Sequence, residues 1–101
     1  MVRWVRTATI AGTSKFGKAM EFAQMSKGLT SRFPEAKKIE VFIDMFGNSG
    51  NVRWSIDYPD LATLEKVQKK ILADADYWKL LAQYEDAFVQ GQVEDIVMME
   101  I

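Results

Sequence analysis

The sequence predicts an α+β domain in which helices cover one face of an antiparallel β-sheet. Three observations lead to this prediction. Four segments alternate apolar and polar residues as strands do, segments with helical spacing of apolar residues lie between them, and a cluster of small residues joins the second strand directly to the third. With 101 residues, the chain has room for one domain, residues 1–101, with a core of modest size.

The first strand and the first helix are predicted near the N-terminus. Residues 2–10 are rich in Val, Thr, Trp and Ile, alternate with Arg, and stop before Gly12, as expected of a strand. Either Thr13 or Ser14 can then cap a helix that continues to about residue 32. The side of this helix expected to face the core carries Phe16, Ala19, Met20, Ala23 and Leu29.

A hairpin is predicted in the middle of the chain. Residues 38–46 and 52–58 both alternate apolar and polar side chains, and residues 47–51 read GNSGN. These small residues tolerate positive φ angles, so the two strands are expected to pair directly.

Two helices and a last strand complete the predicted order. Asp60 is expected to cap a helix that begins near Leu61, and Asp74 a second helix over residues 75–89 that ends at Gly91. Residues 93–101 alternate again and predict the final strand. The order strand, helix, strand, strand, helix pair, strand is the split βαβ pattern of the ferredoxin-like fold, βαββ(αα)β.

One motif points to a different function. Residues 12–18 fit G-x-x-x-x-G-K, the spacing of a loop that cradles phosphates. However, Ala19 stands where that motif needs a hydroxyl, and the strand that carries Asp44 turns straight into a hairpin, whereas phosphate-loop proteins need a parallel sheet. We therefore interpret the glycines as relaxing a turn between strand and helix, with Lys15 and Lys18 in solvent.

Composition excludes several classes of function. The net charge is -1, so the chain has no overall positive field to attract nucleic acid or an anionic membrane. It contains no His and no Cys, which removes ordinary zinc and haem ligands and thiolate nucleophiles, and predicts a protein without metal or cofactor. No signal peptide and no membrane-spanning run is visible, so we expect a cytoplasmic protein with no membrane partner.

The second half of the chain carries a family resemblance. The segments VRWSIDY (52–58), ILADADYW (71–78) and FV (88–89), with the closing strand, resemble the dimeric α+β barrel proteins, most of all NIPSNAP-type members. The resemblance implies a homodimer in which two sheets meet face to face and close into a barrel with a cavity in each half. Members include cofactor-independent monooxygenases and haem-degrading enzymes. The chain has no His, so the activities of the haem-binding and His-dependent members are not carried over.

The predicted sheet itself favours pairing. One face is strongly apolar and is expected to pack against the helices. The other face mixes apolar and charged residues, and its apolar residues are Phe42, Phe46, Ile96 and Met98. An apolar patch rimmed by polar groups usually marks an interface or a ligand site. The alternative is that this mixed face is simply exposed to solvent.

RNA-recognition modules share this topology, but their K/R-G-F/Y-G/A-F-V-x-F/Y segment is missing from this chain.

The barrel interior supplies the candidate site. Arg53 is expected opposite Asp44 or Glu40 across the hairpin, where a structural ion pair is the alternative to ligand binding. Trp4, Trp54 and Tyr58 would suit a flat aromatic molecule, unless they are simply core. The predicted ligand-binding residues are Arg6, Glu40, Phe42, Asp44, Arg53, Trp54, Ser55 and Asp57.

The sequence thus predicts a homodimeric protein that binds a small apolar or aromatic molecule in the barrel cavity. Two other functions stay open: a cofactor-independent monooxygenase or isomerase-like enzyme, and a structural or assembly module without catalysis. No residue pattern decides between binding and turnover.

Overall fold

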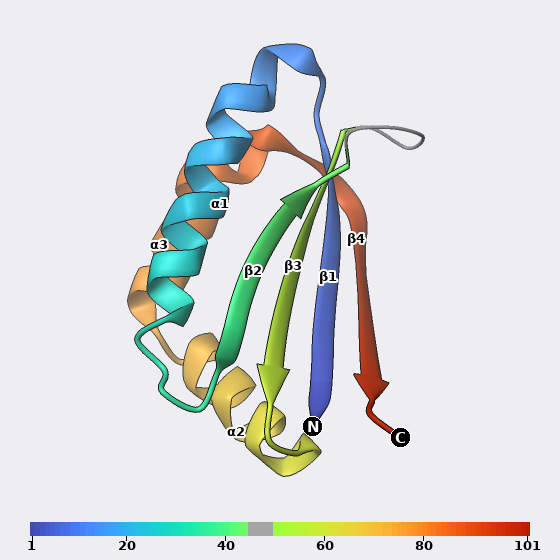
Figure 1. The fold of residues 1–101 in the computed structure, drawn as a ribbon. Helices are drawn as coiled ribbons and strands as arrows, with labels where there is room; N and C mark the ends of the chain where they lie inside the picture. Colours follow the sequence, from blue (N-terminus) through green and yellow to red (C-terminus); the bar gives the residue numbers. More distant parts are fainter. Residues whose placement is uncertain (45–49) are drawn as a thin grey trace.

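The computed structural model describes residues 1–44 and 50–101. Within them, four strands form one sheet, in the order β2-β3-β1-β4, and every neighbouring pair is antiparallel. Figure 1 shows the helices gathered on one side of this sheet. The α+β, ferredoxin-like prediction is confirmed. The elements are β1 (Val2–Ile10), a 3-10 turn (Thr13–Lys15), α1 (Phe16–Thr30), β2 (Lys37–Ile43), β3 (Asn51–Tyr58), α2 (Leu61–Leu72), α3 (Ala75–Tyr84), a second 3-10 turn (Glu85–Ala87) and β4 (Phe88–Met99).

Strand alternation decides what each face of the sheet carries. On β3, Val52, Trp54 and Ile56 point toward the helices, where they join the buried core. Arg53, Ser55 and Asp57 point the other way, because successive side chains of a strand leave opposite faces. We call this second side, which no helix in Figure 1 covers, the open sheet face.

The buried apolar side chains of the described residues form two clusters. One lies beneath α1 and α3, and the other beneath α2 at the far end of the sheet. The first contains Ala8, Ile10, Ala19, Phe22, Ala23, Val52, Trp54, Leu80, Tyr84 and Ala87. The second contains Val2, Ala36, Ile56, Tyr58, Leu64, Val67 and Ile71.

The structure confirms two of the predicted helix caps and corrects a third. The Asp60 carboxylate accepts a hydrogen bond from the Thr63 backbone N–H at 2.7 Å, and the Asp74 carboxylate accepts one from the Asp76 N–H at 2.8 Å. Neither Thr13 nor Ser14 caps α1, because both lie in the 3-10 turn before it and no side chain caps that helix.

The first helix buries a different aromatic residue from the one predicted. Phe16 is 48% exposed at the start of α1, whereas Phe22 lies in the core. One apolar stripe of a helix faces the sheet, and Phe22 shares it with Ala19 and Ala23.

The predicted end of the last helix is wrong. α3 ends at Tyr84, and Phe88 and Val89 already belong to β4, with Phe88 opposite Ile10 of β1. Gly91 therefore does not end a helix; it lies within β4 at φ +79°. Pairing with β1 starts β4 five residues earlier than the alternating pattern alone indicated.

The predicted hairpin is confirmed by antiparallel pairing of β2 with β3. β2 ends at Ile43, and Met45, Phe46 and most of the predicted turn lie outside the described residues. Within residues 1–44 and 50–101, no helix is long and apolar enough to cross a membrane.

Candidate functional site

An apolar cavity of about 410 Å³ lies between the helices and the β1 and β4 side of the sheet. It forms where the chain leaves α3, passes the second 3-10 turn and returns to the sheet as β4. Its size falls within the range of about 300–1,000 Å³ that small-molecule sites occupy. Its apolar lining includes Ala8, Phe22, Trp54, Leu81, Phe88 and Val93.

The wall of this cavity is an aromatic cluster centred on Phe22. Its ring lies 5.8 Å from that of Trp54, 5.8 Å from that of Tyr84 and 5.3 Å from that of Phe88, between ring centroids. The Trp54 Nε1 donates a hydrogen bond to Ser26 Oγ at 2.9 Å, which fixes the indole. Aromatic rings held in this way present flat apolar surfaces to a ligand.

Arg6 brings one positive charge to this apolar wall. Its Nε and Nη2 donate to the two carboxylate oxygens of Asp95 on β4, both at 2.8 Å, and its guanidinium carbon lies 5.0 Å from the centre of the Trp4 ring. The hydrogen bond to Asp95 raises the pKa of Arg6, with a smaller contribution from the Tyr77 hydroxyl. The side chain is one-third exposed, at 33%.

The placement of Arg6 corrects the sequence interpretation. We expected it inside the barrel with Arg53, but it lies opposite Trp54 on the helix side of the sheet. Val2 and Ala8 are buried on that side, and alternation along β1 places Arg6 with them. The sequence did not fix which face each β1 residue occupies.

A smaller cavity of about 80 Å³ adjoins the first. Arg6, Phe22, Trp54 and Leu81 line both cavities. Trp4 and Tyr77 line only the smaller one, so Arg6 lies where the two meet.

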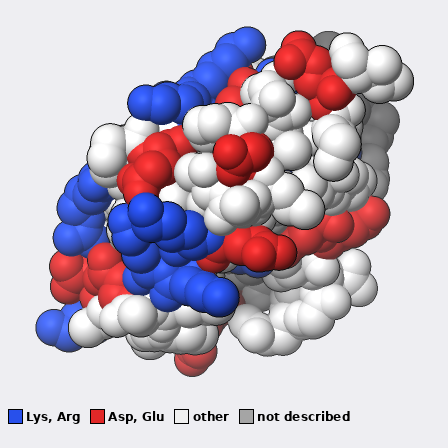
Figure 2. All heavy atoms as spheres, turned by 90° about the horizontal axis from the view of Figure 1, so that it is seen from below, with Lys and Arg blue, Asp and Glu red and all other residues white. Residues whose placement is uncertain are grey.

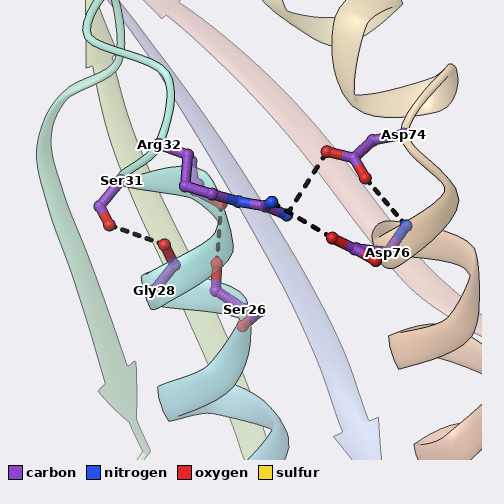
Figure 3. A network of polar contacts seen from close by, with 7 residues as sticks. Ser26, Gly28, Ser31, Arg32, Asp74 and Asp76 are labelled. Carbon is purple, nitrogen blue, oxygen red and sulfur yellow. Dashed lines mark hydrogen bonds and ion pairs between the residues drawn. The ribbon is translucent and has the colours of Figure 1, made fainter.

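Helix α3 forms the outer wall and is tied to α1 by ion pairs. Arg32, just after α1, reaches Asp74 Oδ2 at 3.4 Å and Asp76 Oδ2 at 3.2 Å, as Figure 3 shows. At the cavity rim, the exposed Trp78 donates its Nε1 hydrogen bond to the Leu72 carbonyl at 2.8 Å. The helix is thus held at its N-terminal end, and its later residues line the cavity.

The lysines of the phosphate-loop motif are paired rather than free in solvent. Lys15 donates to Asp86 Oδ2 at 3.0 Å, and Lys18 donates to Asp86 Oδ1. These bonds lower the pKa of Asp86 to about 2. The strand that precedes the motif, β1, pairs antiparallel with both of its neighbours, whereas a phosphate loop follows a strand of a parallel sheet. Both observations favour a structural role for the motif.

The open sheet face carries ion pairs between neighbouring strands. Arg53 donates to Asp44 at 3.0 and 3.1 Å and also to Thr7 at 3.3 Å, so Asp44 is its partner of the two carboxylates, Asp44 and Glu40, that the sequence indicated. Arg3 donates to Asp57 at 2.7 and 3.1 Å, a pair that the sequence analysis missed. Hydrogen bonds from Arg53 and Arg3 lower the pKa values of Asp44 and Asp57 respectively.

The same face also exposes apolar side chains. Phe42, Ile96 and Met98 are 51%, 48% and 46% exposed, and they lie on the two edge strands β2 and β4. Phe42 lies opposite Arg53, and Glu40 lies opposite Ser55. Six of the eight predicted site residues are therefore on the open sheet face, and Arg6 and Trp54 line the cavity.

Charge on the surface is mixed. On the face seen in Figure 2, acidic and basic side chains lie next to one another without a large area of one sign. Among residues 1–44 and 50–101, no three carboxylates gather as metal ligands would.

Comparisons with known proteins show which solved structures share this fold. No family model and no curated protein matches the chain. A NIPSNAP domain protein from Burkholderia xenovorans is 14% identical, with a TM-score of 0.82 over 100% of this chain and 95% of that one. A putative antibiotic biosynthesis monooxygenase from Nitrosomonas europaea is 12% identical, with a TM-score of 0.77 over 100% and 99%.

A NIPSNAP family protein of unknown function from Agrobacterium tumefaciens is 13% identical, with a TM-score of 0.77 over 97% of this chain and 86% of that one. These structures belong to the dimeric α+β barrel superfamily. They confirm the fold that the resemblance implied, and at these identities they show the fold alone.

Proposed function

We propose that the protein is a homodimer in which each chain binds a small apolar or aromatic molecule in the cavity between α1, α3, β1 and β4. The observation that carries this proposal is the aromatic cavity of about 410 Å³ within a single chain. A large apolar cavity with a few polar groups is the usual form of a small-molecule site.

The cavity lies on the other side of the sheet from the site that the sequence indicated. The barrel interior requires a second chain, and its polar groups Arg53, Asp44, Arg3 and Asp57 already pair with one another. We therefore assign the ligand to the helix side and the open sheet face to the contact between the two chains.

Ligand binding is tested with N-phenyl-1-naphthylamine, a neutral aromatic probe that fluoresces in apolar surroundings. Ala82 is an exposed α3 residue that lines the cavity, so Ala82→Trp should fill it and weaken probe binding at least tenfold. Ala62→Trp, on the exposed side of α2, is the matched control and should bind as the natural protein does. Equal binding by all three proteins would refute the assignment of the cavity.

Dimer formation is supported by the apolar part of the open sheet face, since clusters of exposed apolar side chains usually mark interfaces. Light scattering should give a mass near twice 11.5 kDa. Phe42→Lys should yield monomers, whereas Phe16→Lys, at a Phe of similar exposure on α1, should stay dimeric. A monomeric natural protein would refute this part of the proposal.

A cofactor-independent oxygenase is the second candidate. It is favoured by the aromatic wall and by the solved structures of this fold that are named antibiotic biosynthesis monooxygenases. Oxygen uptake with electron-rich polyphenols, beyond that of the Ala82→Trp variant, would support catalysis. Probe binding without oxygen uptake would leave a binding protein, and neither activity would favour an assembly module.

We also propose that the protein is cytoplasmic, as the sequence led us to expect. A fluorescent fusion observed in cells would test this location directly.

A further inference from the structure

Arg6 is an unusual member of an apolar cavity wall. It lines both adjoining cavities together with Phe22 and Trp54. A charge next to apolar surface is costly unless a partner balances it. Asp95 is that partner, through two hydrogen bonds of 2.8 Å.

The pair still has hydrogen-bond donors to offer. A guanidinium carries five N–H groups, and Asp95 accepts from two of them. Asp95 accepts from Nε and Nη2, and the guanidinium carbon lies over the Trp4 ring. Three N–H groups remain, two on Nη1 and one on Nη2. Tyr77, in the wall of the smaller cavity, is one acceptor that acts on Arg6, and a ligand oxygen would be another.

The charges around Arg6 determine which oxygen fits. Asp95 neutralises Arg6 through two hydrogen bonds. A ligand carboxylate would therefore bring a second negative charge to a single guanidinium. A neutral carbonyl oxygen would accept the N–H groups without that repulsion.

We propose that the Arg6–Asp95 pair makes the cavity select neutral aromatic molecules that carry a carbonyl oxygen, over aromatic hydrocarbons and over aromatic carboxylates. This inference rests on the proposed function, because it requires an aromatic molecule in the cavity. It goes further by naming the polar group of the ligand, a carbonyl oxygen, and the residues that would recognise it: Arg6 as the hydrogen-bond donor and Asp95 as the group that balances the charge of Arg6.

Three naphthalene derivatives of nearly equal shape test the selection. 2-Acetylnaphthalene carries a carbonyl, 2-isopropenylnaphthalene replaces its oxygen by a methylene group, and 2-naphthoate carries a charged carboxylate. Their affinities are measured by displacement of N-phenyl-1-naphthylamine. The ketone should bind about tenfold more tightly than the alkene, as expected for one hydrogen bond to a charged donor, and the carboxylate should bind more weakly than the ketone.

Two substitutions test whether the Arg6–Asp95 pair causes the preference for the ketone. Arg6→Met should abolish the difference in affinity between the ketone and the alkene, and continued binding of N-phenyl-1-naphthylamine by this variant shows that the cavity is still formed. Asp95→Asn removes the balancing charge, so 2-naphthoate should become the tightest ligand of the three. Lys66→Met, on the exposed side of α2, removes a positive charge elsewhere and should change none of the three affinities.

The experiment distinguishes failure of this inference from failure of the proposed function. Equal affinities for ketone and alkene in the natural protein, or a preference that survives Arg6→Met, would overturn this inference while leaving the cavity assignment in place. If N-phenyl-1-naphthylamine itself does not bind, the proposed function fails and this inference fails with it.

Discussion

Arg3 and Arg6 are both on β1, three residues apart, and they serve opposite faces of the sheet. Arg3 pairs with Asp57 on the open sheet face, and Arg6 pairs with Asp95 beside the cavity. Because side chains alternate along a strand, an odd separation places them on opposite sides. Single positions on β1 thus decide whether an arginine contributes to the proposed interface or to the proposed ligand site.

The pair of Arg3 and Asp57 should make stability depend on pH. The hydrogen bond from Arg3 lowers the pKa of Asp57 below its usual 3.8, so the ionised carboxylate stabilises the folded state above about pH 4. This contribution is lost as the pH falls through the folded-state pKa. Asp57→Asn should therefore lower the Tm at pH 7, and the difference from the natural protein should narrow as the pH falls below about 4. A difference that is constant over this range would contradict the assignment.

The hydrogen bond between Trp54 and Ser26 should stabilise the cavity wall. Trp54 is only 7% exposed, so Ser26→Ala would leave its N–H buried without this acceptor. We expect a loss of about 1–3 kcal/mol in the free energy of unfolding. Ser31→Ala is the control, because the Ser31 hydroxyl is exposed and bonds the Gly28 carbonyl within the same helix region. Figure 3 shows both serines. Equal losses in urea titrations would contradict this role of Ser26.

Among the elements, α3 and β4 together create the cavity. α3 begins at a cap that its own sequence supplies, Asp74, and it ends where β4 starts to pair with β1. Arg32 ties its first turn to the end of α1. The short turn of residues 85–87 therefore separates a helix and a strand that each contribute an aromatic ring, Tyr84 and Phe88, to the cavity wall.

The cap of α2 should have a measurable effect on stability. The Asp60 carboxylate accepts the Thr63 backbone N–H at 2.7 Å, so Asp60→Ala should lower the free energy of unfolding by about 1 kcal/mol. Glu65→Ala, at an exposed position inside the same helix, should change it by less than about 0.5 kcal/mol. Chemical denaturation measures both, and a larger loss at position 65 would contradict the capping role.

For the whole molecule, the proposed dimer makes stability depend on concentration. An association that occurs only in the folded state stabilises it by mass action, so the Tm should rise as the protein concentration rises. Phe42→Lys should abolish that rise, since it places a charge on the proposed interface. Calorimetric scans over a hundredfold range of concentration would test this, and a constant Tm for the natural protein would contradict the dimer.

The sequence by itself determined the order of the elements, the caps at Asp60 and Asp74, and the position of Arg53 across the hairpin from Asp44 and Glu40, of which Asp44 is its partner. These features depend on residues that are neighbours in the chain or face one another across a hairpin. They could be predicted because local propensity and alternation specify them.

Three features were decided only by the tertiary structure. These are the sheet face that Arg6 occupies, the residues at which α3 ends and β4 begins, and the position of the apolar cavity on the helix side. The pairing of β1 with β4 joins residues more than seventy positions apart, such as Ile10 and Phe88. Such contacts leave no periodic signal within either segment. The ligand site proposed here arises at this long-range junction, and the sequence pattern therefore pointed to the opposite face of the sheet.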